Sequence, residues 1–463
     1  MSGDPAAERY GSAPGSFRDE LRFARISARR VWGSYWLVPS LYVLGALMLS
    51  VVLVRWDQND PIELTQSISA SSASTALSAL GSGMLTFTGF VTSVVLMLVQ
   101  FGSSQFSPRF VARFRRSRTL MYALSTFSAT FLFALVSTTQ VGRGSADFVP
   151  TRTLIAALLL TLLSILMFLV LINSTSNGLR VARVVQAVDR LARDVFDTTY
   201  PSNASDADAA TATAESLRDR TPVQTIYVGP VGRVVVAFDQ KGLSHLAQRH
   251  GALIELVPAI GDHVRSGGPL LHIYGSHELS EHRLRRYVAL GDERTLDDDP
   301  AFAFRLLVDV ASKALSPAVN DPTTAVQCLD RIEDLLRYAA AKQLSAGVVT
   351  DAHGSARLVY RTPTWDDLVE LALDEIRAFG ASQYQVARRM RALLDDLITD
   401  VPENRRPALQ RQRDLLLDAV TTAIPQGQRA DAVVPDRQGI GMARTGPAAI
   451  TSGGVTAVHP AGP

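Results

Sequence analysis

The chain contains a single cysteine, Cys328, among its 463 residues. One thiol forms neither an internal disulfide nor a thiolate metal cluster, and its scarcity suits a reducing compartment. Catalytic signatures are missing as well, because the sequence has no Walker loop, nucleophile elbow, HExxH motif or dinucleotide fingerprint. The histidines between His245 and His282 also lack the close spacing of a zinc site. We therefore expect no enzyme, no cofactor and no metal.

Charged residues are missing from four long apolar stretches in the first part of the chain. These stretches are 37–54, 84–101, 121–140 and 153–172. Each is long enough to cross the roughly 30 Å hydrocarbon layer of a lipid bilayer. Since none of them contains Asp, Glu, Lys or His, a proton relay or a voltage sensor has no group to use. The sequence predicts four transmembrane helices.

Arginines collect beside these stretches rather than in one patch. They precede the first stretch, fill residues 109–118 after the second, and follow the fourth at 180–193. By the positive-inside rule, all three clusters lie in the cytoplasm, which places both termini there, in the cell (inner) membrane. The acidic loop with Asp57, Asp60 and Glu63 then lies outside. Arginines at membrane flanks give no reason to expect nucleic acid as a partner.

Outside these apolar stretches, the amino-acid composition changes from one segment of the chain to the next. Both ends are rich in Gly, Ala and Pro, and residues 200–220 are small and polar. A basic amphipathic segment, Phe17–Val31, lies on the membrane surface or forms a solvated arm. We expect a disordered terminus at 1–16, a membrane domain at 17–199, a linker at 200–220, a small β-domain at 221–278, an α-helical cytoplasmic domain at 279–424 and a disordered tail at 425–463.

The fold class expected is therefore membrane α-helical, followed by a cytoplasmic α+β region. Strands are predicted at Val223–Val228, Arg233–Phe238 and Leu253–Val257, with a helix at Gln240–His250. The segment Val257–Ile273 resembles half of a biotinyl- or lipoyl-type hairpin, which implies a small barrel-like unit. No lysine lies between residues 252 and 282 to carry a swinging arm. Further helices are expected at 282–290, 300–315, 323–342, 364–379, 383–399 and 403–423, and a strand at 357–361.

One face of the second apolar helix carries small or polar residues at alternating steps of three and four. This stripe consists of Ser72, Thr75, Ala79, Ser82, Thr86, Gly89, Ser93, Leu96 and Gln100. Small residues let helices approach closely in lipid, so the stripe is a packing seam in one interpretation. In the other it lines a water-filled path. The candidate residues for either role are Ser82, Thr86, Gly89, Ser93 and Gln100.

A second group of polar residues lies around the predicted helix 300–315. Arg305, Asp309 and Lys313 are spaced four apart and share one narrow face of an otherwise apolar helix. Asp321 and Pro322 then begin the next helix as N-cap and first turn. The arrangement is a buried helix with paired charges, or a ligand site whose loop residues are Asn320, Asp321, Thr323 and Thr324. The acid at Asp321 argues against an anionic ligand.

Several motifs resemble one known family. These motifs are Arg294–Thr295, Asp299–Phe302, "LLVDVASKALSP", "NDPTTAV" and "FGSSQFSPR". They closely resemble the predicted bacterial membrane proteins catalogued as domain of unknown function 2254. The resemblance covers roughly residues 22–423 and implies four spans and a soluble C-terminal region. It implies no activity.

Two functions fit the sequence. The first is a homo-oligomeric channel for ions or small solutes, with the second span at its centre and the cytoplasmic part as vestibule or gate. The alternative is a non-conducting regulatory or scaffolding protein that binds a ligand or partner through its cytoplasmic domain. An enzyme acting on lipid has no supporting set of residues.

Overall fold

The computed structural model describes residues 37–60, 69–105, 118–142, 148–178, 181–200, 220–295, 299–344 and 347–442. The expected disordered N-terminus, the amphipathic segment 17–31, most of the arginine-rich loop and of the linker, and residues 443–463 lie outside these ranges. The chain divides into two units. The first comprises Met1–Thr199, Ala204–Leu306 and Ser345–Thr362, and the second comprises Tyr200–Asn203, Leu307–Leu344 and Pro363–Pro463.

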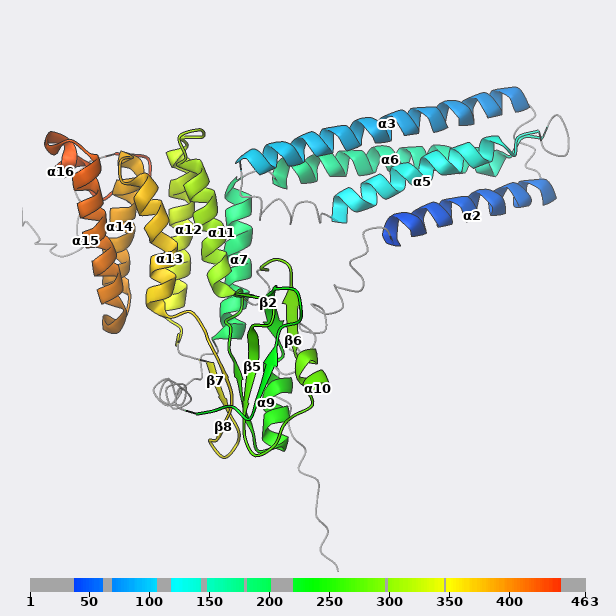
Figure 1. Cartoon of the computed structure of the whole chain (residues 1–463). Coiled ribbons are helices and arrows are strands. Elements are labelled where there is room, and N and C mark those ends of the chain that lie inside the picture. The colour runs from blue at the N-terminus through cyan, green and yellow to red at the C-terminus, as the bar shows by residue number, and fades with distance from the viewer. Residues whose placement is uncertain are drawn as a thin grey trace, which may run out of the picture. The chain divides into compact units, whose positions relative to one another are not determined.

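Four helices of the first unit are long and apolar enough to cross a membrane, as predicted (Figure 1). They are α2 (Leu37–Asn59), α3 (Ala70–Gln105), α5 (Arg118–Thr138) and α6 (Thr151–Gly178). The helix α3 begins fourteen residues before the predicted span because its Ser- and Ala-rich start contains no helix breaker. Its 36 residues carry no charge.

The helix α5 packs against α2, α3 and α6, and hydroxyl groups join it to two of them. Ser137 Oγ lies 3.0 Å from Ser50 Oγ of α2, and Thr130 Oγ1 lies 2.9 Å from Ser164 Oγ of α6. Phe87 of α3 completes the packing with an edge-on contact to Phe127 at a ring separation of 5.2 Å. Hydrogen bonds of this kind hold helices together in lipid, where burial of apolar surface contributes little.

A buried carboxylate connects the end of α2 to the start of α6. Asp57, which is 2% exposed, accepts hydrogen bonds from the backbone nitrogens of Arg152 and Thr153, both at 3.2 Å. The Arg152 guanidinium pairs with Asp57 at 3.2 Å and with Asp60 at 2.9 Å, and it lies over the ring of Trp56. Asp57 therefore caps the first turn of α6 from another helix.

The amphipathic helix α7 (Val181–Thr199) follows α6. Its buried face includes Val185, Val188 and Phe196. The Phe196 ring meets Phe304 of α11 (Pro300–Ala314) edge-on, with the ring centres 6.2 Å apart. The apolar stripe of α7 is thus covered by protein rather than by lipid at this contact.

Two sheets form the β-part of the first unit. The five-stranded sheet has the order β1-β5-β3-β8-β7, and the three-stranded sheet has the order β4-β2-β6. The strand bounds are β1 (Gln224–Tyr227), β2 (Arg233–Phe238), β3 (Leu253–Leu256), β4 (His263–Val264), β5 (Pro269–Tyr274), β6 (Val288–Gly291), β7 (Gly347–Thr350) and β8 (Ala356–Tyr360). Neither sheet closes, so the expected barrel-like unit is corrected to two open sheets. The reason is that β8 adds to β3 in parallel, which extends the larger sheet instead of closing it.

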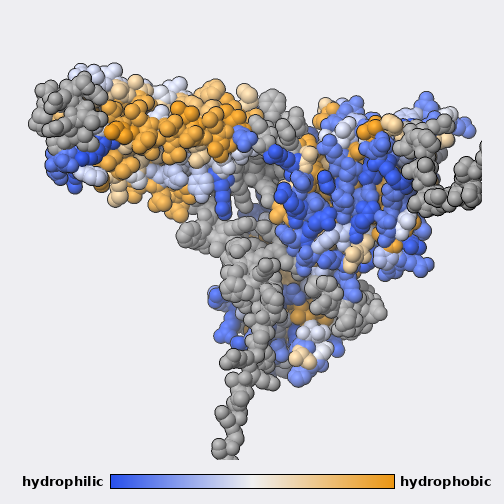
Figure 2. Space-filling model, turned by 180° about the vertical axis from the view of Figure 1, so that it is seen from behind, coloured by the Kyte–Doolittle hydropathy of each residue, from blue (hydrophilic) through white to orange (hydrophobic). Residues whose placement is uncertain are grey.

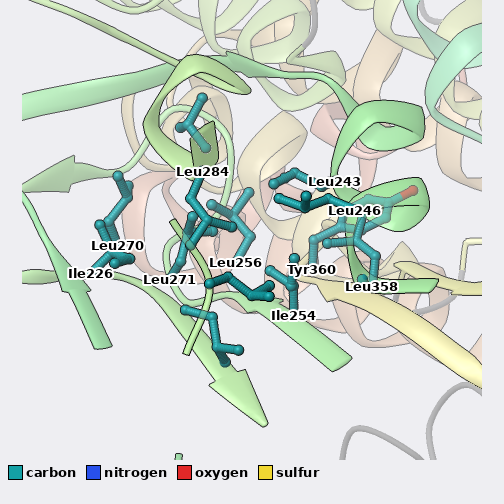
Figure 3. Close-up of a cluster of buried hydrophobic side chains, with 14 of the residues drawn as sticks. Ile226, Leu243, Leu246, Ile254, Leu256, Leu270, Leu271, Leu284, Leu358 and Tyr360 are labelled. Carbon is teal, nitrogen blue, oxygen red and sulfur yellow. The ribbon is translucent and has the colours of Figure 1, made fainter. Parts of the chain in front are cut away.

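The core of this β-part lies between the sheets and the helix α9 (Gln240–Arg249). Figure 3 shows Ile254, Leu271 and Leu358 from three strands meeting Leu243 of α9. Asp239 caps α9 as its side chain accepts from the backbone nitrogen of Gly242 at 2.9 Å. These alternating apolar residues account for the predicted strands.

One prediction in the following segment is wrong and another is confirmed in an unexpected setting. The predicted helix 282–290 is only α10 (Glu281–Arg286), and β6 follows it and pairs with β2. The strand predicted at 357–361 is present as β8, but it joins the five-stranded sheet. Its partner β7 was not predicted. Both differences come from pairing between distant strands, which local patterns do not encode.

The second unit is a helical bundle. Its helices are α12 (Pro322–Ala340), α13 (Trp365–Gly380), α14 (Tyr384–Asp400), α15 (Arg406–Ala423) and the short α16 (Arg429–Ala432). A buried guanidinium, Arg389, joins α14 to α12 by binding Asp330 at 2.7 Å and Glu333. Burial opposes the charge of Arg389, but its hydrogen bonds and charge interactions with Glu333 and Asp330 together outweigh burial and raise its pKa. Residues 425–442, expected to be disordered, are ordered against α14 because α14 side chains bind their main chain.

Candidate functional site

The predicted stripe lies on the face of α3 that its own bundle leaves uncovered. All nine positions, from Ser72 to Gln100, are exposed, whereas Ala73, Leu77, Met84 and Val91 on the opposite face are buried. Among the described residues, the stripe is therefore no seam with α2, α5 or α6. The structure brings Ser82, Thr86, Gly89, Ser93 and Gln100 onto one continuous exposed face, as the spacing predicted.

The hydroxyl groups of this stripe donate to their own helix. Thr75 and Ser82 bond the carbonyl oxygens four residues earlier at 2.8 Å, and Thr86 and Ser93 do so at 3.0 Å. Each hydroxyl hydrogen is thereby satisfied without water, while the oxygen keeps acceptor capacity on the exposed side. These four hydroxyl groups can therefore face lipid, protein or a polar solute without an unsatisfied donor.

The exposed side chains of α6 can be compared with those of α3 in the same bundle. The exposed face of α6 carries large aliphatic residues throughout, which is what lipid contact requires, and one face of the bundle is accordingly hydrophobic in Figure 2. These residues are Ile155, Leu158, Leu159, Leu162, Leu163, Ile165, Leu166, Leu169, Val170 and Ile172. The exposed face of the first half of α3 carries only small ones. They are Ser71, Ser72, Thr75, Ala76, Ser78, Ala79, Ser82 and Gly83.

The second half of α3 differs from the first. Between Leu85 and Gln100 the stripe is flanked by exposed bulky residues, among them Leu85, Phe90, Val94 and Met97. A neighbouring helix can approach the first half closely and is held away from the second by these side chains. The stripe therefore divides at about Met84 into a small half and a flanked half.

The second predicted group of residues lies on α11 and at the start of α12. Every residue of α11 is buried except Arg305, Asp309 and Ser312, which are half-buried, and Lys313, which is exposed. Asp321 begins α12 as predicted, and its carboxylate accepts from Thr324 at the backbone nitrogen (3.1 Å) and at Oγ1 (2.6 Å). The helix end that an anion would use is thus already occupied by an acid.

The neighbouring loop exposes the remaining predicted residues. Asn320 and Thr323 are both exposed. Asn320 has a left-handed backbone conformation with φ of 48°, and the amide of Gln383 donates to its side chain at 3.4 Å. The loop is accessible, and its geometry is set by contacts within the second unit.

Sequence reasoning missed an ion pair between two residues of the recognised motifs, in which Asp299 is buried and Arg294 is 38% exposed. Arg294 Nε donates to Asp299 at 3.0 Å, and the same carboxylate caps α11 through the backbone nitrogen of Phe302 at 3.1 Å. Burial raises the pKa of Asp299 even though Arg294 attracts the charged form. Gly261, with φ of 90°, leaves the space that the Arg294 guanidinium fills. In the sequence, the only signal for this ion pair is that Arg294 and Asp299 lie five residues apart.

Two further observations concern metal ligands and hollows in the described ranges. No group of three or more His, Cys, Asp and Glu residues there could hold a metal ion. An open hollow of about 620 Å³ lies between the β1–β2 loop and the end of β6. Its charged residues, Arg233 and Asp292, bind each other.

Comparisons with known proteins agree with this architecture. An uncharacterised protein of Mycobacterium tuberculosis and one of Mycobacterium bovis are each 27% identical over 402 residues, which cover 84% of this chain and 76% of the relative. No solved structure matches the chain. The family model described as "Predicted membrane protein (DUF2254)" matches residues 32–396. This chain therefore belongs to the DUF2254 family of predicted membrane proteins.

Proposed function

We propose that this protein is a homo-oligomer of the inner membrane, with both termini in the cytoplasm, that conducts ions or small polar solutes along α3. The observation that supports this proposal is the uncovered face of α3, whose small residues contrast with the aliphatic face of α6. Lipid contact explains the face of α6 but gives no reason for the small residues of α3. Close packing against the α3 helix of a second copy explains these small residues.

The two halves of the stripe then have different roles. The small half, around Ala76 to Gly83, is where helices from neighbouring copies cross closely. Beyond it, Leu85 and Phe90 hold the helices apart, so Thr86, Ser93 and Gln100 line the space that opens. The sequence continues into the arginines at 109–118, which favours anions at the inner mouth.

Flux from liposomes tests conduction. The purified protein should release a small anion from loaded vesicles, and the double change Thr86→Leu with Ser93→Leu should reduce the rate at least about tenfold by filling the path with apolar side chains. The matched control is Leu162→Ala on the aliphatic face of α6, which should leave the rate unchanged. Absence of flux from a correctly folded, reconstituted oligomer would remove the channel proposal.

A regulatory or scaffolding role is the second candidate. It is favoured by the exposed loop at Asn320, whose backbone conformation is rare for a residue other than glycine. Recovery of a stoichiometric partner that is lost on Asn320→Gly, together with full function of the Thr86→Leu, Ser93→Leu variant in cells, would favour this role over conduction.

A further inference from the structure

The last segment that the structure describes, which ends at Met442, lies against α14 in the second unit. After α15, the chain turns through the exposed residues Pro425–Gln428 and the short helix α16, and it then runs to Met442. We call Asp431–Met442 the C-terminal clasp. It lies beyond the family match, which ends at residue 396.

Side chains of α14 hold the clasp by its main chain. Arg388, only 8% exposed, donates from Nε to the carbonyl oxygen of Asp431 at 2.8 Å and from Nη1 to that of Gly441. The amide of Gln385 donates to the carbonyl oxygen of Gly439 at 2.7 Å. The buried charge of Arg388 is thus satisfied by carbonyl groups of the clasp, and water can replace these carbonyl groups when the clasp separates from α14.

The clasp folds around its own buried acid. The Asp436 carboxylate, 1% exposed, accepts from the backbone nitrogens of Gln438 and Gly439 at 3.0 Å and of Gly441 at 2.6 Å. Gly439 has φ of 68°, and a Cβ placed there would lie 2.6 Å from Val326 Cγ1 of α12. The bend at Gly439 therefore fits against α12 only without a side chain.

The buried apolar side chains of the clasp are small: Ala432 is fully buried, and Val433 and Val434 are half-buried. The two largest apolar side chains of the clasp, Ile440 and Met442, are 62% and 44% exposed. The helices that the clasp contacts bury larger apolar side chains, since Leu329 of α12 and Leu393 of α14 are fully buried. Hydrogen bonds to the clasp, including those that Arg437 donates to Asp396 of α14, exchange for bonds to water on opening, whereas separating the helices exposes their apolar core to water. The clasp is therefore the element of this unit that opens at the lowest free energy.

We propose that the C-terminal clasp is a conformational switch, which opens as a unit while α12, α13 and α14 remain folded. Opening uncovers Arg388, Gln385 and Val326 together. The surface thus exposed carries a guanidinium and an amide that had bound main-chain carbonyl groups. This inference does not depend on conduction through α3.

Hydrogen exchange of the full-length protein in detergent tests the switch. The amides of Gln438, Gly439 and Gly441 should exchange faster than those in the middle of α12 and α14. Gly439→Val should increase opening of the clasp at least about tenfold, because its side chain meets Val326 and its backbone conformation is strained. Gly427→Val is the matched control, since open space surrounds its Cβ position, and it should leave exchange unchanged.

A second variant keeps the test decisive if Gly439→Val misfolds. Asp436→Asn keeps an acceptor but removes the charge that binds three backbone nitrogens, so clasp exchange should rise while protection of α12 and α14 persists. Equal exchange rates of clasp and helix amides in the unmodified protein would overturn the proposal. So would an equal loss of protection over the clasp and both helices in Asp436→Asn.

Discussion

Replacing Asp57 by alanine tests the connection between α2 and α6. The change removes the carboxylate that accepts two backbone nitrogens at the start of α6 and that pairs with Arg152. Loss of a helix cap costs about 1 kcal/mol, and loss of one partner of a buried ion pair costs about 3–5 kcal/mol. Because Arg152 keeps Asp60 and is 18% exposed, we expect about 3 kcal/mol in total.

Thermal unfolding in detergent measures this loss. At about 2–4 °C per kcal/mol, Asp57→Ala should lower the Tm of the bundle by about 6–12 °C. Asp60→Ala is the control, since its side chain is 72% exposed and an exposed ion pair contributes at most about 1 kcal/mol. An unchanged Tm for Asp57→Ala, or an equal loss for Asp60→Ala, would refute the reasoning.

Three further predictions concern the residues that follow α7. Gly261→Ala should destabilise the first unit by more than about 2 kcal/mol in chemical unfolding, because its φ of 90° strains any side chain and the new Cβ also meets the buried carboxylate of Asp299. A hydrogen bond from Arg357 lowers the pKa of Asp351. The β7–β8 turn should therefore be fully stable above the unfolded carboxyl pKa of about 3.9 and should lose stability as the pH falls through the lower pKa of the folded state. Amide exchange measures this loss, and Arg357→Ala should move its midpoint to higher pH. Arg389→Met should cost about 2–4 kcal/mol in urea unfolding, because it leaves the buried acid of α12 with a single cation.

Matched changes control two of these predictions. Gly251→Ala shares the positive φ of Gly261 but has open space around it, so it should cost only the backbone strain, about 1 kcal/mol. Lys313→Met removes an exposed cation from the second unit and should change stability by less than about 0.5 kcal/mol. If either control matched its partner in cost, contact with the named groups would not explain the effect.

Local patterns predicted the helices and several strands well. The strand Arg233–Phe238 and the caps at Asp239 and Asp321 appear at the predicted residues, because a cap or an alternating strand depends on its immediate neighbours. The apolar span predicted for α3 starts only at Met84, but the stripe already placed Ser72 on the same helix, because Ser and Ala do not break a helix.

Long-range pairing could not be predicted. The parallel contact between β3 and β8 joins residues about a hundred positions apart, and it places a strand from the expected helical domain in the β-part. The stripe on α3 was visible in the sequence, but its exposure was not, because spacing fixes which residues share a face and not what covers that face. The order of residues 425–442 was missed because it depends on Arg388 and Gln385 of another helix.

Cysteine cross-linking in native membranes tests most directly whether α3 meets a second copy. The natural thiol of Cys328 is fully buried, and burial raises its pKa, so it should remain unreactive. Oxidation of Ser82→Cys should give disulfide-linked dimers, whereas Leu162→Cys on the lipid-facing side of α6 should stay monomeric. Monomeric Ser82→Cys, or equal cross-linking of both variants, would contradict the oligomer built on α3.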